Sequence, residues 1–312
     1  MKQIKHYFIA NNTSDLAKMN LKNILNNGII EKRRVGRWCM KKDSMEKMLE
    51  THSITFELTN PKKCITSQHC LGVEVETEDY FLGLNPGYVH LSPWRFYKKW
   101  IQTNGKYHYT YGSRGGIYIN DVVKKLKDDP TSRHAVVNLF NTDKDLYNEF
   151  VPCSTQWIFY ISKNKLNMVT TMRSQDACRG FFLDTFAYPL IQQIIAKRLG
   201  IEMGKYYHII LNSHIYYDDI EFAKKLLKSL KPIGKLEIDN LTDFNMNLLQ
   251  QSSYQLYKKH DTVMSQKIAK QLPDFWYKWK CNQIIYIYTK YISKQEYTTE
   301  LTCQGVMVNV YS

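Results

Sequence analysis

Residues 152–172 read PCSTQWIFYISKNKLNMVTTM, and this stretch decides how the fold is interpreted. The segments 154–161 and 165–172 are rich in β-branched and aromatic residues, which is typical of strands in a buried sheet. Residues 135–140 (AVVNLF) and 205–213 (KYYHIILNS) have the same character. The middle of the chain is therefore expected to contribute several strands to one core.

Helical patterns lie among these strands. Residues 184–200 (DTFAYPLIQQIIAKRLG) predict a helix that ends at Gly200, with Pro189 in its first turns. Residues 218–230 predict an amphipathic helix with Asp218 as its cap. Strands mixed with helices in this way indicate an α/β domain.

The amino-terminal part shows a similar mixture. Ser14 indicates the start of a helix whose apolar face continues until Gly28 ends it. A strand is expected near residues 54–58 (ITFEL), and a helix over 120–128 that Pro130 stops. No internal repeat and no obvious linker separates these segments.

Length and composition favour an ordinary globular protein. The chain has 312 residues, of which 44% are hydrophobic and 23% charged. No apolar run approaches the roughly 20 residues that cross a bilayer, and the amino terminus lacks the apolar core of a secretory signal. We therefore expect an intracellular, cytoplasmic protein with no membrane association.

The chain contains 7 cysteines and no CxxC pair, so neither a zinc site nor a disulfide framework is indicated. No bound metal is expected. In a reducing compartment such thiols are free, and most are buried and inert. A reactive cysteine must therefore be recognised by the groups around it.

The net charge of +14 favours anionic partners, which include nucleic acid, membranes and phosphorylated metabolites. The stretch FWYKWK at 275–280 interleaves basic and aromatic residues, a pattern that suits single-stranded nucleic acid. The same pattern fits buried aromatics beside solvated lysines, and we favour that interpretation. Nucleic acid is not the expected partner.

Polar residues that could form one site follow or end several of the expected strands. Cys153 precedes one strand, Arg173 and Ser174 follow the next, and His214 and Tyr216 follow a third. Each alone fits a structural role. Together they fit an anionic nucleotide site, because arginine lowers the pKa of a neighbouring thiol and grips phosphate with paired donors.

At these residues the chain resembles the thymidylate synthase superfamily, over roughly residues 20–245. Seven segments carry the resemblance in register: NILNNG…RRVGR (23–37), ETEDYFLG (76–83), NGKYHYTYG (104–112), DPTSRHAVVNLFN (129–141), VPCSTQWIFYI (151–161), MRSQDACRGFFLD (172–184) and NSHIYY (212–217). The resemblance implies a large mixed sheet with flanking helices, one sheet face forming a dimer interface. Residues 1–245 would be the catalytic domain, and 246–312 a divergent extension packed on it.

The resemblance also assigns chemistry. Cys153 would attack C6 of a pyrimidine, which is covalent catalysis. Glu76 would manage proton transfers at C5 and at the base carbonyl, and Tyr111 would line the pocket near the cysteine. Asp176 and Gly180 would contact 5,10-methylenetetrahydrofolate, the one-carbon co-substrate.

The substrate implied is a pyrimidine nucleoside monophosphate. Arg173, Ser174 and Arg34 would bind its phosphate, and His214 and Tyr216 would hold its sugar 3′-hydroxyl. Arg133 matches an arginine that the family donates across a two-fold axis, which implies a homodimer.

Asp184 stands where thymidylate synthases have asparagine. An amide serves uracil, whereas a carboxyl group accepts from the cytosine amino group and, when protonated, donates to N3. Deoxycytidylate hydroxymethylases of this superfamily carry aspartate here. The alternative is that Asp184 caps the helix that it begins, since aspartate is a favoured cap. We favour cytosine, with dCMP as substrate.

Two endings of the reaction are open at this point. A synthase methylates its base, whereas a hydroxymethylase lets water add to the exocyclic methylene. Ser154 and Asp79 replace a histidine and a tryptophan of the synthase pattern, which favours water and hydroxymethyl-dCMP. The alternatives are a methyltransferase on dUMP or dCMP, a hydroxymethylase of dUMP or CMP, and a non-catalytic member that binds nucleotide or RNA.

Overall fold

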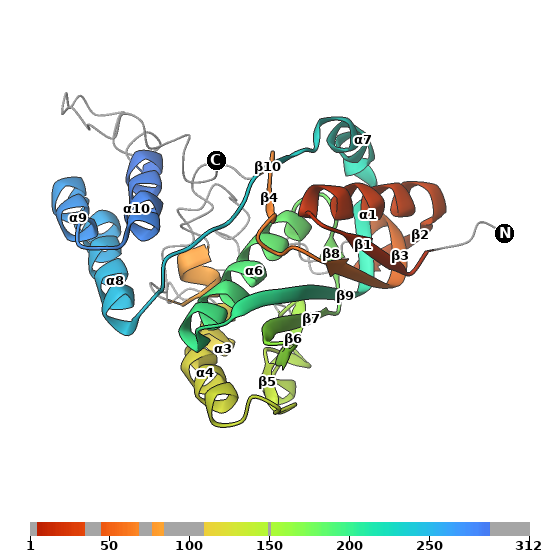
Figure 1. The fold of residues 1–312 in the computed structure, drawn as a ribbon. Helices are drawn as coiled ribbons and strands as arrows, with labels where there is room; N and C mark the ends of the chain where they lie inside the picture. The colour runs from red at the N-terminus through yellow and green to blue at the C-terminus, as the bar shows by residue number, and fades with distance from the viewer. Residues whose placement is uncertain (1–4, 35–44, 69–76, 84–108, 149–150, 288–312) are drawn as a thin grey trace, which may run out of the picture. The chain divides into compact units, whose positions relative to one another are not determined.

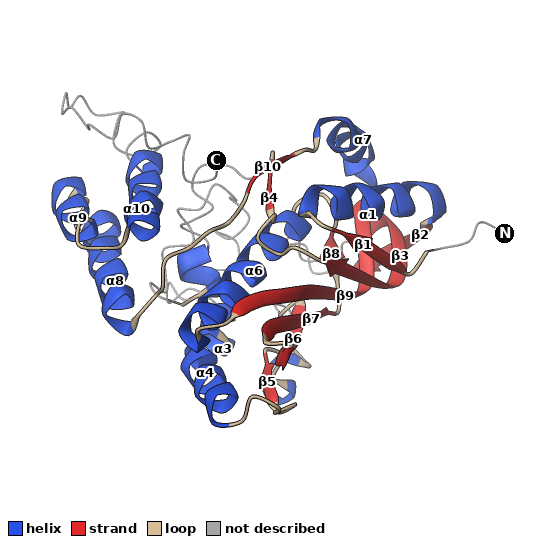
Figure 2. Cartoon of the chain, in the orientation of Figure 1, coloured by secondary structure: helices blue, strands red, loops and turns tan. Residues whose placement is uncertain are grey.

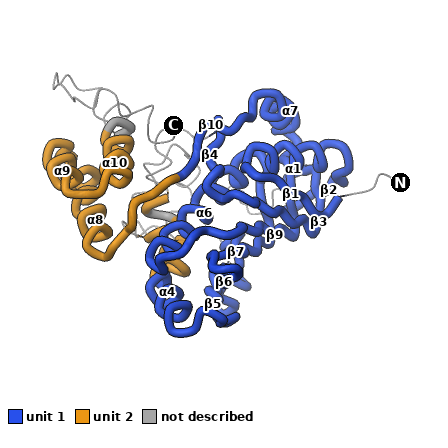
Figure 3. Tube along the Cα trace, viewed as in Figure 1, with its two compact units in different colours: residues 1–69, 118–236 blue, residues 70–117, 237–312 orange. Residues whose placement is uncertain are grey.

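The computed structural model describes residues 5–34, 45–68, 77–83, 109–148 and 151–287. The chain divides into two compact units, each formed by two separate stretches (Figure 3). The first contains residues 1–69 and 118–236, and the second contains 70–117 and 237–312. These units do not coincide with the predicted domains 1–245 and 246–312. That boundary concerns the extent of the catalytic domain and stays a prediction.

The first unit is built on a mixed sheet of 8 strands (Figures 1 and 2). Its central path runs β1-β3-β9-β7-β6-β5, with β2 paired to β3 and β8 paired to β9. The strands are β1 (Tyr7–Ala10), β2 (Ile29–Arg34), β3 (Met45–Leu58), β5 (Ala135–Asn138), β6 (Ser154–Ser162), β7 (Lys165–Met172), β8 (Gln175–Asp176) and β9 (Glu202–Tyr216). Strands β4 (Ile65–Thr66) and β10 (Pro232–Gly234) form a separate pair. The expected large mixed sheet is confirmed.

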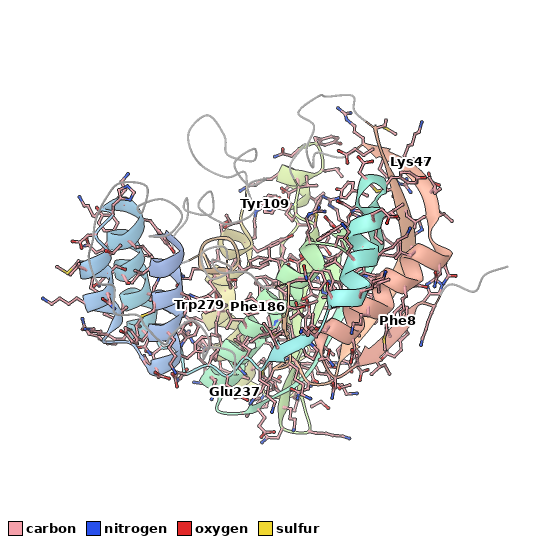
Figure 4. All side chains as sticks on the ribbon, turned by 90° about the horizontal axis from the view of Figure 1, so that it is seen from above. Phe8, Lys47, Tyr109, Phe186, Glu237 and Trp279 are labelled. Atoms are coloured by element: carbon pink, nitrogen blue, oxygen red, sulfur yellow. The ribbon has the colours of Figure 1, made fainter. Side chains whose placement is uncertain are left out.

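Helices pack against this sheet. They are α1 (Thr13–Asn27), α4 (Ile119–Asp128), α6 (Gly180–Leu199) and α7 (Ile220–Ser229), with the single turn α5 (Thr142–Asp145) between β5 and β6. Helix α6 contacts β7 and β9, and α1 contacts β3. Phe186 of α6 has no solvent exposure and lies among closely packed side chains (Figure 4).

The two faces of the sheet differ in burial. Along β9, Tyr206, His208 and Ile210 face the helices and are at most 1% exposed. The alternate residues Ile209 and Leu211 are 37% and 59% exposed, as the two-residue period of a strand requires. The described residues of the first unit thus leave an apolar sheet face uncovered.

The strands expected near 54–58, 154–161, 165–172 and 205–213 are confirmed, although β3 and β9 are much longer than expected. They are longer because they pair with each other from Met48 opposite Tyr216 to Leu58 opposite Tyr206. The expected amino-terminal helix and the helix before Pro130 are confirmed as α1 and α4.

Three local predictions were wrong. Helix α1 begins at Thr13 and not at Ser14, and it is capped by Asn12, whose side chain accepts from the Asp15 amide. Helix α7 begins after a short 3-10 turn at Tyr217–Asp219, so Asp218 is not its cap. Helix α6 begins at Gly180 and not at residue 184, which places Pro189 in its interior.

The second unit contains the π-helical turn Thr77–Phe81, α3 (Tyr111–Arg114), α8 (Asp243–Lys258), α9 (Thr262–Ala269) and α10 (Asp274–Ile287). The stretch FWYKWK lies on α10, where Trp276 and Trp279 have no exposure. Figure 4 labels Trp279. The expectation that these aromatics belong to a core is confirmed. The two buried tryptophan rings cannot stack on the bases of a nucleic acid.

One lysine of this stretch departs from the expectation of a solvated charge. Lys280 is fully buried and donates to Glu78 Oε2 at 2.7 Å, while Trp279 Nε1 donates to Glu78 Oε1 at 2.7 Å. Ser253 and Gln283 also bond to this pair. Burial of the lysine is tolerated because the unit supplies both an opposite charge and hydrogen-bond partners for its ammonium group.

Candidate active site

Cys153 lies directly before β6, and Arg173 lies directly after β7, its antiparallel neighbour. The Arg173 backbone amide donates to the Cys153 carbonyl at 2.8 Å. The guanidinium donates from Nε to the Pro152 carbonyl at 2.9 Å and from Nη2 to the Val151 carbonyl at 3.1 Å. These bonds hold Nη2 at 3.7 Å from Cys153 Sγ. Strand pairing therefore brings the thiol and an arginine together.

The electrostatic balance at this thiol differs from the expectation. Burial raises the pKa of Cys153, Arg173 lowers it, and the charges of Asp184 and Asp176 raise it further. The net pKa lies above the usual value, so Arg173 does not outweigh burial in the free protein. Neutralising the carboxylate of Asp184 or Asp176, or placing a further cationic side chain near the thiol, would lower the pKa of Cys153 and favour its thiolate.

Asp184 lies inside α6, one turn past its start, and is 6% exposed. Burial raises the pKa of its carboxyl group to about 7, against a smaller lowering by the Gln175 amide, which donates to Asp184 Oδ2 at 2.7 Å. Arg179 occupies the position before the helix. The helix-cap interpretation of Asp184 is therefore wrong, because a residue inside the helix cannot cap it.

His214 and Tyr216 lie near the end of β9, buried, with ring centroids 5.0 Å apart in an edge-to-face contact. His214 Nδ1 lies 3.0 Å from Asn212 Oδ1. Residues 214 and 216 share a face because side chains alternate along a strand. The structure thus brings the two expected sugar-binding residues together.

A buried carboxylate connects this part of β9 to β2. Glu50 has no exposure, lies opposite His214 in the β3–β9 pair, and receives bonds from Arg33 Nε at 3.0 Å and Nη2 at 2.9 Å. Burial raises the pKa of Glu50, but the bonds from Arg33 and His52 outweigh it and hold the pKa below its usual value. This ion pair anchors β2, whose last residue is Arg34.

The acidic residue expected at the folate is held from two sides. The Cys178 amide donates to Asp176 Oδ1 at 2.8 Å, and Arg179 Nη1 lies 3.8 Å from Oδ2. Arg179 itself forms a two-pronged ion pair with Asp219, at 2.6 and 2.9 Å. Gly180 follows as the first residue of α6. The Asp176 carboxylate is therefore oriented before any ligand binds.

For most of the remaining predicted site residues, the structure gives their position and exposure. Arg34 and Arg133 are exposed, at the end of β2 and before β5, and Ser174 is half-buried between Arg173 and β8. Tyr111 belongs to the second unit, where its ring packs 5.2 Å from that of Phe81. Glu76 lies outside the described residues. The roles of these residues stay predictions.

Several residues at the site were not anticipated from the sequence. They are Glu50, Asn212, Gln175, Tyr206 and His208. A usable signal was present for the last two, because polar residues at positions i and i+2 of an otherwise apolar strand lie on one face, here the buried one. Glu50 and Gln175 acquire their partners only through strand pairing.

Among the described residues, no group of three or more histidine, cysteine, aspartate or glutamate side chains is placed to hold a metal ion. None of the described helices has the length and apolarity that a membrane crossing requires.

The chain is similar to known proteins both in sequence and in structure. Residues 18–266 match the family model described as thymidylate synthase. Among solved structures, the thermostable thymidylate synthase A from Bacillus subtilis is similar, with a TM-score of 0.58 and 21% identity, over 70% of this chain and 84% of that chain. At this identity the structural likeness supports the fold alone.

Proposed function

The chain belongs to the thymidylate synthase family, and on that premise we propose that it is a folate-dependent hydroxymethyltransferase acting on dCMP. Cys153 would be its nucleophile, and 5,10-methylenetetrahydrofolate its one-carbon co-substrate. The family supplies the class of reaction. The choice of dCMP depends on Asp184 in this chain.

In the proposed reaction the Cys153 thiolate adds to C6 of cytosine, and C5 becomes nucleophilic. C5 takes the one-carbon unit and loses its proton, and tetrahydrofolate leaves to give an exocyclic methylene. Water then delivers hydroxide to that methylene as the sulfur departs from C6. The net change converts dCMP, methylenetetrahydrofolate and water into 5-hydroxymethyl-dCMP and tetrahydrofolate.

Asp184 is the observation that carries the choice of base. Its carboxyl group is buried, its pKa is raised to about 7 by that burial, and its charge acts on the pKa of Cys153. A group that titrates near neutrality can both accept from the cytosine amino group and donate to N3. A wrong pairing in a buried site costs about 1–3 kcal/mol per unsatisfied group, which suffices to select a base.

The hydroxymethyl ending rests on resemblance rather than on a group seen at the methylene. Ser154, which replaces the histidine of the synthase pattern, is fully buried, and its hydroxyl bonds to that of Tyr188. It therefore belongs to the packing behind Cys153. The segment MRSQDACRGFFLD, with its aspartate at 184, supports the hydroxymethylase assignment.

Product analysis tests the proposal directly. The purified protein is given methylenetetrahydrofolate with dCMP, dUMP and CMP in competition, and products are identified by mass spectrometry. We expect 5-hydroxymethyl-dCMP and no rise in dihydrofolate absorbance. Dihydrofolate would indicate methylation instead, since only hydride transfer from tetrahydrofolate produces it. Binding of nucleotide or RNA without turnover would support the non-catalytic alternative.

We also propose that the uncovered face of the sheet forms a homodimer through which Arg133 reaches the partner's phosphate site. The face carries exposed apolar residues on strands from both edges and the middle of the sheet, namely Ile9 on β1, Val136 on β5, and Ile209 and Leu211 on β9. Burying apolar area of this kind is the usual driving force of subunit association.

Subunit mixing tests this arrangement. Arg133→Ala and Cys153→Ala proteins, each inactive, are mixed and allowed to exchange subunits. Half of the dimers become hybrids with one intact site of two, so activity should recover to about one quarter of wild type. Arg173→Ala mixed with Cys153→Ala is the control, because both residues belong to one subunit's site and no hybrid site is intact. Equal recovery in both mixtures, or in neither, would contradict the role of Arg133.

A further inference from the structure

A chain of buried hydrogen bonds runs from β9 through β8 to Asp184. Tyr206 OH lies 2.6 Å from His208 Nδ1, and His208 Nε2 lies 2.5 Å from Gln175 Oε1. Gln175 Nε2 then donates to Asp184 Oδ2 at 2.7 Å. All four residues are at most 6% exposed. No step of the proposed reaction uses Tyr206, His208 or Gln175.

The Gln175 amide, with Oε1 toward His208 and Nε2 toward Asp184, gives this series of hydrogen bonds its direction. Burial lowers the pKa of His208 to about 3, so its ring is neutral and carries one N–H. Because Nε2 faces a carbonyl oxygen, the proton lies on Nε2, and Nδ1 accepts from Tyr206. Burial also raises the pKa of Tyr206, so that its hydroxyl keeps the proton that it donates. The His208 Nε2–H, which donates to Oε1, in turn keeps the Gln175 amide with its NH₂ group toward Asp184.

Packing fixes the ring that sets this direction. The His208 ring has its centroid 5.7 Å from Phe181 in a perpendicular contact, and 6.3 Å from Tyr188. Gly180 leaves space for the amide, since a Cβ at that position would lie 3.1 Å from Gln175 Nε2. The amide can therefore approach Asp184 without displacement, and the imidazole cannot turn freely.

This direction has a consequence for the Asp184 carboxyl group. Oδ2 already accepts from Gln175, so a proton placed on Oδ2 would oppose the amide N–H. Any proton on the carboxyl group is therefore confined to Oδ1. A neutral carboxyl whose proton moves between its oxygens can pair with cytosine or, in reversed order, with uracil. Fixing the proton leaves one order only.

We propose that Gln175, His208 and Tyr206 are positioning residues which hold the donor and acceptor atoms of Asp184 in one order, and that this order makes the site select a single pyrimidine. The inference rests on the proposed function for the identity of that base, cytosine. The hydrogen-bond direction itself is independent of it.

The test measures dissociation constants of dCMP and dUMP by calorimetry, without folate. Wild type should prefer dCMP. Gln175→Leu and His208→Phe should lower this preference by about tenfold or more, since the first removes the amide that donates to Asp184 and the second removes the N–H that orients this amide. His208→Gln, which retains a side-chain N–H for Gln175 Oε1, should keep most of the preference. Gln192→Leu is the matched control, because it removes a buried amide that donates to the Leu166 and Lys205 carbonyls instead.

A second readout does not depend on nucleotide. Nitrogen NMR of the free protein should show His208 as the Nε2–H tautomer, and a proton on Nδ1 would overturn the inference. If wild type selects dCMP while Gln175→Leu and His208→Phe match Gln192→Leu, the inference fails and the proposed function stands. If wild type does not distinguish dCMP from dUMP, the proposed function fails, and so does the inferred selection of one base by Asp184.

Discussion

Alanine at position 153 is expected to lower the turnover of dCMP by at least about 10⁴-fold, because removing a nucleophile removes the covalent pathway and leaves only binding and polarisation. The dissociation constant of dCMP should change by only a few fold, because the phosphate, sugar and base contacts are assigned to other residues. Single-turnover kinetics and calorimetry measure the two quantities separately. Turnover within tenfold of wild type would contradict covalent catalysis by Cys153.

Cys64→Ala provides the matched control. Cys64 also belongs to the first unit and has no exposure, and burial raises the pKa of its thiol far above the usual value. The same chemical change there costs packing but no nucleophile, so turnover should stay near wild type. An equal loss in Cys64→Ala would mean that the effect at position 153 reports folding and not chemistry.

Alkylation gives Cys153 a signature in pH. Its pKa is raised, chiefly by burial, so the thiolate is a minor species at neutral pH. The rate of labelling by iodoacetamide should therefore rise about tenfold per pH unit until the pH exceeds the usual thiol range. Saturation of the rate below about pH 8, under the ordinary thiol pKa, would show that Arg173 outweighs burial after all.

The residue types and their order predicted the sheet and much of the site. Cys153 and Arg173 could be assigned together because each adjoins a strand with an unmistakable composition, and those strands pair. The sign of the shift in the Cys153 pKa could not be predicted, since it depends on how burial compares with one cation. Sequence supplies the groups, whereas the balance between them is a property of the packed site.

Long-range partners mark the limit of the prediction. Lys280 looked like a solvated charge because its partner, Glu78, lies 202 residues away in the sequence. The start of α6 was misplaced for a related reason. Gly180 and Phe181 carry no strong local signal, and the helix is extended by packing of Phe181 against Phe56 and His208. Tertiary contacts overrode local preference at both places.

Asp184→Asn combined with Gln175→Leu is expected to shift the preference for the base toward dUMP. Without the Gln175 amide, which donates to the side chain at position 184, the asparagine amide can turn so that it accepts from uracil N3–H and donates to O4. In that orientation its NH₂ group faces the amino group of cytosine and its oxygen faces the unprotonated N3. Two reversed pairings should shift the ratio of dCMP to dUMP affinities by about 10²-fold or more. Calorimetry with both nucleotides measures the shift. Asp145→Asn, at another buried aspartate, is the control and should leave the ratio unchanged.

Asp184→Asn alone should alter the pH dependence of stability. The folded pKa of Asp184 is about 7 and the ordinary value is 3.8, so the folded state holds this proton more tightly than the unfolded state. The stability that the protonated group contributes is complete below about pH 4 and is lost as pH rises through about 7. An asparagine side chain does not titrate, so the Asp184→Asn protein should gain up to about 3–4 kcal/mol relative to wild type across this window.

Urea unfolding at about pH 4, 5.5, 7 and 8 tests this sign. A difference between Asp184→Asn and wild type that grows with pH throughout this range supports a carboxyl group held neutral by burial. A constant difference would mean that Asp184 is already ionised in the folded protein at acid pH. In that case it could accept from the cytosine amino group but could not donate to N3, and selection of the base would depend on a single hydrogen bond. The pH profile of stability therefore tests the protonation state on which the choice of cytosine depends, without any nucleotide present.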